Sequence, residues 1–491
     1  MQRTRFSVWR QFMLVIAAAC FSTMASAQDA SPEFVSSETL MLGEVLASAQ
    51  QYFPVILSAL VERRVARGDI MIAESQFDMV FSADTFNRIT GFYDGQVATA
   101  KVERPVRDYG AKVFGQYRIS NGDFPIYEDE FYTNTGGQIK AGAVLSLLRD
   151  REIDSYRFAE SDARMAMREA DLEVLLTRIG VQQQAAMAYW NWVAAGAQMA
   201  VYEELLANAV ERDAGLIRQV SSGARAQFYL TENQQNITRR RTLLLRAQLD
   251  NRMAANQLSM YYRGSGGQPI TPLELQLPPI QRPESTTLVP LDWNTQNLKS
   301  TISSRPEVLQ LKNVIARAME RVRLEENSLK PRLDLSVEVA TGLGNVGEGG
   351  PSRDSTDTIV ALNFTVPFEQ REAKARVAQS EAKLEALQIK QRYLEEQIDL
   401  ELRAIMMELE YSRELAELAA LEVEQSQQLE QAELSRFESG ASDFFLVNIR
   451  EEAVANARIK SISAMLDTRL AQVSFDAATI DLERLQIESD L

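Results

Sequence analysis

Two long segments of the chain combine a helical spacing of apolar residues with an absence of proline. Proline is missing between Pro125 and Pro269 and again after Pro367, and inside a helix it would remove a hydrogen bond and clash with the preceding turn. Apolar residues in the second segment recur every three, four or seven positions, as in a helix packed along another helix: Leu384, Leu387, Leu394, Ile398, Leu402, Ile405 and Leu409. The pattern predicts four helices, at about 149–221, 228–262, 371–437 and 444–487.

A glycine between serine and alanine separates the two helices of each pair. The first break is Ser222-Gly223-Ala224 and the second is Ser439-Gly440-Ala441. Glycine accepts left-handed backbone angles, so each break predicts a tight turn between antiparallel helices. The sequence Arg157-Phe-Ala-Glu-Ser-Asp-Ala-Arg164 returns as Arg376-Val-Ala-Gln-Ser-Glu-Ala-Lys383, at nearly the same distance before its glycine. We infer two structural repeats, 28–262 and 305–491, joined by a linker over 263–304 that is rich in glycine and proline.

Alternation of apolar and polar residues precedes each long helix and predicts β-strands. Arg332 to Val339 alternates without exception, and the segment 357–367 repeats its apolar face. We expect strands at about 331–341 and 357–367, and two more within about 76–148, which makes four in each chain. The remaining residues of 84–136 must form long loops or an extra hairpin, and the pattern does not decide between them. The polar positions of the expected strands are Lys112, Gln116, Arg118, Lys140, Arg332, Asp334, Ser336 and Glu338.

Strands of this length with one apolar and one polar face are typical of a transmembrane β-barrel. A half-buried sheet in a soluble protein has the same pattern. The barrel is favoured because no other layer is evident that would cover the apolar face. An open sheet edge cannot lie in lipid and four strands are too few to close, so several copies of the chain would have to form the barrel. The eight polar residues would then line its wet bore.

The first 27 residues read as a secretory signal. Three arginines precede an apolar run from Phe12 to Phe21, and Ala25-Ser26-Ala27 resembles a cleavage site. The single cysteine, Cys20, lies within this segment. It lacks the leucine usual three residues before a lipoprotein cysteine, so we expect no lipidation. Cleavage after Ala27 would leave a mature chain without cysteine and therefore without disulfide bonds.

Composition argues against several classes of function. The full chain carries a net charge of −16, and removal of three signal arginines makes it about −19, which disfavours binding to nucleic acid. The chain contains no histidine, which excludes histidine-based catalytic and metal sites. The glycines from Gly342 to Gly347 fit a dinucleotide fingerprint but do not open a helix, so a flexible loop is the better interpretation. We expect no enzyme activity, cofactor or bound metal.

Several motifs, taken in order, resemble the TolC-like outer-membrane efflux proteins over essentially the whole mature chain. Arg305-Pro-Glu-Val308 is similar to the start of the short helix in the second repeat of that family. Lys330-Pro-Arg-Leu333 is similar to the family's entry into a strand, and Val366-Pro-Phe368 is similar to its strand-to-helix exit. Arg436-Phe-Glu-Ser-Gly-Ala-Ser-Asp443 is similar to its periplasmic tip. Leu147-Leu148-Arg149 departs from the pattern because it has no proline at the first exit.

The resemblance implies a mainly helical homotrimer with a twelve-stranded barrel in outer-membrane lipid and a long α-helical tunnel in the periplasm. It also implies a passive duct for efflux or type I secretion, which docks a periplasmic adaptor protein and serves an inner-membrane transporter. The docking residues would be those of the two tips: Ser222, Gly223, Ala224, Ser439, Gly440, Ala441 and Asp443. Asp443 could also form an acidic ring at the constricted end, or simply cap the helix that follows it.

Two other classes of protein fit parts of the pattern. A secreted coiled-coil structural or adaptor protein would also contain helical hairpins, although its strands would not be expected between helices in both halves. A secreted hydrolase could use paired carboxylates, but no segment concentrates them into a site. Extraction separates these classes, because only the barrel requires detergent.

Overall fold

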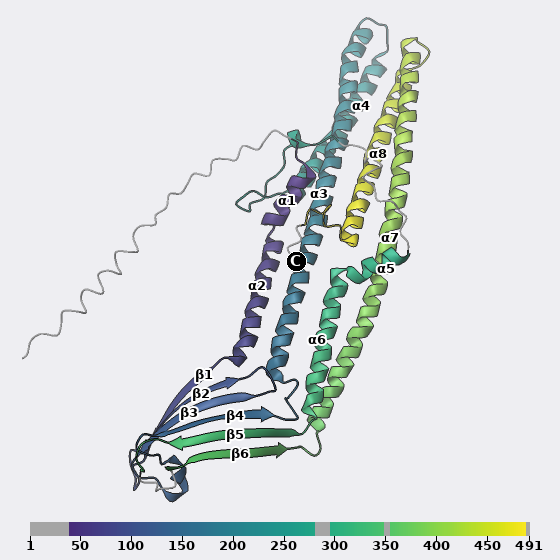
Figure 1. Cartoon of the computed structure of the whole chain (residues 1–491). Helices are drawn as coiled ribbons and strands as arrows, with labels where there is room; N and C mark the ends of the chain where they lie inside the picture. The colour runs from purple at the N-terminus through teal and green to yellow at the C-terminus, as the bar shows by residue number, and fades with distance from the viewer. Residues whose placement is uncertain (1–38, 280–294, 348–353, 488–491) are drawn as a thin grey trace, which may run out of the picture. The chain divides into compact units, whose positions relative to one another are not determined.

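Long helices and one β-sheet make up the part of the chain that the computed structural model describes, residues 39–279, 295–347 and 354–487 (Figure 1). The expected signal segment, including Cys20, lies outside these residues, as does the middle of the expected linker. The end of that linker is helical in the structure, where α5 runs from Thr295 to Ser304. Its Leu298 is buried against Ile398 and Leu402, and this packing explains why the segment does not behave as a linker.

Four long helices form two antiparallel hairpins. Helix α3 (Ser155–Ser221) packs along α4 (Gln227–Leu258), and α7 (Arg371–Glu438) packs along α8 (Phe444–Thr479). Contacts between α3 and α8 join the two hairpins. Three residues of the apolar stripe of α7 are buried, with Ile398 3%, Leu402 1% and Leu409 0% exposed, and the other four are half-buried.

Three helix boundaries differ from the expected ones, and the smallest difference is in α4, which ends at Leu258 and not near residue 262. Helix α3 begins at Ser155 and not near residue 149, because the preceding residues form a hydrogen-bonded turn. Helix α8 ends at Thr479 and not near residue 487, because Ile480 takes a left-handed conformation with φ 59°. The chain then turns back, and Leu485 and Ile487 are buried against Ile179.

Shorter helices flank the hairpins. Helices α1 (Leu42–Tyr52) and α2 (Pro54–Glu74) precede the sheet, and α6 (Pro306–Ser328) follows α5. Tyr189 and Trp192 of α3 are buried beside α1, so these two aromatic side chains belong to the core. By length and composition alone, the stretch Leu42–Phe77 could cross a membrane. Proline 54 interrupts it, however, and α2 packs along α3.

The sheet contains six antiparallel strands in sequence order, β1 to β6. The pairing of β4 with β5 joins the strands that precede α3 and the strands that precede α7 in one sheet. The strands are β1 (Val80–Asn87), β2 (Gln96–Pro105), β3 (Lys112–Asn121), β4 (Gln138–Ser146), β5 (Arg332–Gly342) and β6 (Thr356–Thr365). The chain enters α3 directly after β4, so the α3–α4 turn lies one long helix, about 100 Å at 1.5 Å per residue, from that junction.

The expectation of four strands in each chain is wrong. Strands β1 and β2 form an additional hairpin, and the short 3-10 helix Ile126–Phe131 lies between β3 and β4. The apolar positions of β2 include Ala98 and Ala100, whose small side chains give a weak hydrophobic pattern. The figure of twelve barrel strands assumed four strands from each of three chains, so it does not follow from this sheet.

Candidate functional site

One face of the sheet gathers the polar side chains. Residues directly opposite each other in an antiparallel pair point to the same face, so the registers assign every strand position to one of two faces. All eight polar residues expected from the sequence share one face: Lys112, Gln116, Arg118, Lys140, Arg332, Asp334, Ser336 and Glu338. This set is called the polar face below. Its role as the lining of a bore remains a prediction.

Oppositely charged side chains form ion pairs on the polar face. Lys140 Nζ lies 3.1 Å from Glu338 Oε2 on the neighbouring strand. Arg332 Nε donates to Asp334 Oδ2 at 2.6 Å, and Ser146 Oγ donates to Asp334 Oδ1 at 3.2 Å. The face is therefore hydrophilic without a single dominant charge.

The opposite face is apolar and exposed in the single chain. Tyr117, Ile139 and Val339 in the middle of the sheet are 39–46% exposed, and Leu362 and Phe364 near one edge are each 63% exposed. Keeping such a surface in contact with water costs a free energy of about 25 cal/mol for each Å² of apolar area. A surrounding hydrocarbon phase would remove that cost.

Sequence reasoning missed the polar residues of the additional hairpin. Thr99, Lys101 and Glu103 of β2 lie on the polar face, and Lys101 Nζ is 2.6 Å from Glu103 Oε2. Asp84 of β1 lies on the same face. The alternation from Ala98 to Glu103 was the available signal, although its alanines made it faint.

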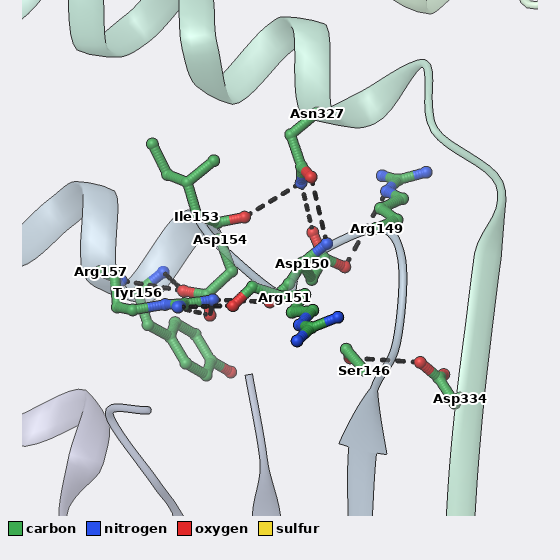
Figure 2. A network of polar contacts seen from close by, with 10 residues as sticks. All are labelled: Ser146, Arg149, Asp150, Arg151, Ile153, Asp154, Tyr156, Arg157, Asn327 and Asp334. Atoms are coloured by element: carbon green, nitrogen blue, oxygen red, sulfur yellow. Dashed lines mark hydrogen bonds and ion pairs between the residues drawn. The ribbon is translucent and has the colours of Figure 1, made fainter. Parts of the chain in front are cut away.

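A hydrogen-bonded network fastens the sheet to the helices (Figure 2). Asp154 caps α3, accepting from the backbone N–H groups of Tyr156 and Arg157 at 2.9 Å each. Arg157 also donates to the backbone oxygens of Asp150 and Arg151, at 2.6 and 2.9 Å. The turn between β4 and α3 is thus held by the first residues of the helix.

Asn327 extends this network to α6. It comes from the end of α6, is only 2% exposed, and donates from Nδ2 to Asp150 Oδ1 and to the oxygen of Ile153, each at 3.0 Å. The second repeat turns in a comparable way, since Asp150 and Gln370 both have left-handed φ angles, 66° and 51°. A left-handed residue therefore stands near each strand-to-helix exit, although only the second exit contains a proline.

The turns of the two hairpins have the same hydrogen bonds. In the first, Ala224 N–H donates to Gln219 oxygen at 2.9 Å, and Gly223 N–H donates to Val220 oxygen at 3.0 Å. The matching bonds of the second turn are Ala441 to Arg436 at 2.8 Å and Gly440 to Phe437 at 3.0 Å. Both are Schellman motifs, in which a left-handed residue satisfies the last carbonyls of a helix. The glycines have φ 75° and 76°, and a Cβ there would meet nothing within 4 Å, so glycine is required by its backbone angle alone.

The structure places Asp443 as the N-cap of α8. Its Oδ1 accepts from Leu446 N–H at 3.0 Å. Such a cap typically contributes about 1 kcal/mol to helix stability. Ser439 and Ser222 occupy the C-cap positions of α7 and α3, so every residue expected at the tips belongs to one of the two turns.

A buried cluster of charges, which the sequence did not reveal, connects the two hairpins. Glu451 of α8 pairs with Arg240 of α4, with 3.0 Å between Oε2 and Nη2, and with Arg212 of α3. Arg240 is 1% exposed and Glu451 is 5% exposed. Arg240 also donates to Leu205 oxygen at 2.8 Å. This Glu451 cluster crosslinks three helices of the two hairpins.

Burial shifts the titration of groups in and beside the Glu451 cluster. Burial, and secondarily the neighbouring positive charges of Arg212 and Arg239, lowers the pKa of Arg240 to about 10, so it stays charged at neutral pH. On α7, burial raises the pKa of Glu430, and the nearby Glu204 carboxylate raises it further. Arg240 is therefore positively charged at neutral pH, and Glu430, a carboxylate with a raised pKa, lies within electrostatic reach of Arg212.

Comparisons with known proteins identify the fold. Neither a protein-family model nor a curated protein matches the chain. Solved structures do match. CusC is 13% identical, with a TM-score of 0.63 over 89% of this chain and 91% of that chain. The open state of the MtrE outer membrane channel of Neisseria gonorrhoeae is 13% identical, with a TM-score of 0.62 over 89% of this chain and 88% of that chain. The outer membrane protein VceC of Vibrio cholerae is 14% identical, with a TM-score of 0.61 over 89% of this chain and 95% of that chain. The chain therefore has the TolC-like outer membrane factor fold, as its motifs indicated.

Proposed function

We propose that this chain forms an outer-membrane channel that serves as the passive exit duct of an efflux or type I secretion system. The observation that carries the proposal is the sheet, with one polar face, one exposed apolar face and a free edge at each side of its described strands. The apolar face would contact outer-membrane lipid. The polar face would line an aqueous bore, with no catalytic step and no cofactor.

Three copies of the chain would form the channel, with the helical hairpins extending into the periplasm. The two turns around Gly223 and Gly440 would dock a periplasmic adaptor protein, which in turn contacts an inner-membrane transporter. The matching Schellman motifs support this assignment, because an adaptor that binds six similar tips around a trimer would meet similar surfaces. The known channels with this fold motivate the outer-membrane location.

Fractionation and mass measurement test the proposal. We expect the mature protein in the outer-membrane fraction, soluble only in detergent, with three chains per particle by light scattering. A monomer or dimer released by osmotic shock would refute the channel and leave a periplasmic coiled-coil structural or adaptor protein as the best account.

A second experiment tests the tips separately from the barrel. Ala441→Arg adds a long charged side chain next to Gly440, at an exposed position of the turn whose backbone is not left-handed. We expect a trimer of normal mass that no longer supports efflux, since docking and not insertion would be blocked. Normal efflux by a well-expressed variant would contradict the docking role.

A further inference from the structure

We propose that β6 of one chain pairs with β1 of the next, so that three copies close an eighteen-stranded barrel. The proposal rests on the proposed trimeric channel and specifies how its wall is built. Six strands form one uninterrupted sheet in each chain, and three such sheets supply eighteen strands.

The two edges of the sheet are the surfaces that a second copy would cover. Among the strands that the structure describes, β1 and β6 each have one neighbour only, and every residue of β1 is exposed. Unpaired backbone groups cannot lie in hydrocarbon, so a sheet in lipid must close on itself or on another copy. Because each chain contributes an even number of antiparallel strands, β6 and the next β1 would run in opposite directions and could continue the ladder.

The registers within the sheet make this closure geometrically consistent. Followed straight across from strand to strand, Val80 of β1 lies level with Ile359 of β6. If the helix-side ends of the two edge strands are paired flush, Thr365 meets Val80 of the next copy and Ile359 meets Phe86. A line drawn straight across the strands of one chain, starting at Val80, therefore reaches the next copy at Phe86, six residues further along β1. Over three copies this offset adds up to eighteen residues, which is the shear of the barrel.

A shear equal to the number of strands fixes the tilt of those strands. With a rise of about 3.3 Å per residue and about 4.7 Å between strands, the tilt is about 35°. Transmembrane barrels have tilts of about 35–45°. The closure therefore needs no distortion of the registers that the chain already has.

The same register matches the faces of the two edge strands. On the apolar face, Phe364 would lie opposite Phe81, and Leu362 opposite Ala83. On the polar face, Asn363 would lie opposite Ser82. Phe364 and Phe81 are 63% and 67% exposed in the single chain, and an aromatic pair directly opposite across two strands stabilises their pairing.

A barrel of eighteen strands would be wider than one of twelve. Diameter grows roughly in proportion to strand number, so the backbone diameter would be about 33 Å against about 22 Å for twelve strands at the same spacing and tilt. The additional hairpin brings Lys101, Glu103 and Asp84 to the polar face. The bore would thus suit bulky, hydrated solutes of either charge.

Disulfide crosslinking between copies tests the closure. The expected mature chain has no cysteine, so Ser82→Cys together with Asn363→Cys introduces the only thiols. We expect oxidation to link the detergent-extracted trimer into covalent dimers and trimers on denaturing gels. Each single variant should remain unlinked. The control pair Phe86→Cys with Asn363→Cys should also remain unlinked, because its partner is displaced by four residues, about 13 Å along the strand.

One further pair identifies the alternative wall. If β1 and β2 lie outside the barrel, β6 would pair with β3 of the next copy, and flush pairing would bring Phe114 opposite Asn363. A trimer that is linked by Phe114→Cys with Asn363→Cys, and not by Ser82→Cys with Asn363→Cys, would overturn the eighteen-stranded closure while leaving the channel intact. A particle that is not a trimer would refute the proposed function itself.

Discussion

Glu451 offers the sharpest test of how the two hairpins are held together. The substitution Glu451→Gln keeps the size of the side chain and removes its charge. Arg240 would then lose its carboxylate partner while remaining 1% exposed, and Arg212 would lose its own. Removing one member of a buried ion pair typically costs about 3–5 kcal/mol, because the remaining charge is uncompensated. The amide oxygen of glutamine can still accept one hydrogen bond, so we expect about 3 kcal/mol.

The next residue provides a matched control. Glu452 pairs with Arg239, whose side chain is 56% exposed, and Glu452→Gln makes the same chemical change one position along α8. Exposed ion pairs contribute about 0–1 kcal/mol. The two variants therefore differ in burial and not in chemistry, and their expected costs differ severalfold.

Hydrogen exchange on the detergent-purified full chain measures the effect locally. A cost of 3 kcal/mol corresponds to roughly a hundredfold loss of protection, at about 1.4 kcal/mol for each factor of ten. For Glu451→Gln we expect this loss in peptides from α4 and α8 around residues 233–251 and 444–458. Glu452→Gln should change protection there less than about fivefold.

Two outcomes would refute this reasoning. Equal effects of the two variants would mean that burial does not govern the Glu451 cluster. A double variant, Arg240→Met with Glu451→Met, that is less protected than Glu451→Gln would also contradict it, because well-packed apolar replacements of a buried pair are often neutral or stabilising.

Three further changes have predictable signs. Asp154→Ala removes a cap that accepts from two N–H groups at 2.9 Å, and should cost about 1–2 kcal/mol, seen as faster exchange in the first turns of α3. Gly440→Ala should destabilise the protein by about 1–2 kcal/mol, because the turn needs a left-handed residue. Gly215→Ala lies inside α3, where an added Cβ meets nothing within 4 Å, and should stabilise by about 1 kcal/mol. Shifts of the melting temperature in the same direction for both variants would contradict this. Burial raises the pKa of Glu430, so the stability of the wild type should fall as the pH rises from 4.5, the ordinary pKa of glutamate, through the raised pKa. Glu430→Gln should therefore be more stable than the wild type at neutral pH. The melting temperatures of the two proteins should converge at acidic pH.

The helices and turns could be predicted from the sequence because they depend on interactions between nearby residues. The burial of Ile398, Leu402 and Leu409 follows from their spacing, because a helix places such residues on one side whatever lies opposite. The turn at Gly440 follows from the need for a left-handed residue after the helix. The polar face could also be predicted, since alternation along a strand assigns residues to faces before any partner strand is known.

Other features depend on segments that are far apart in the chain. Strand β2 was missed because Ala98 and Ala100 give little apolar signal of their own, and only pairing with β1 and β3 makes them part of a sheet. Asn327 and Asp150 are 177 positions apart, and Arg240 and Glu451 are 211 positions apart. No periodicity links such residues.

The sequence alone thus determined the two helical hairpins, their turns and the two faces of the strands, because these depend on neighbours within one turn of helix or a few residues of strand. The tertiary structure decided the number of strands, the network at the sheet-to-helix junction and the Glu451 cluster. These depend on which distant segments pack together, and on the burial that makes an ion pair between them strong.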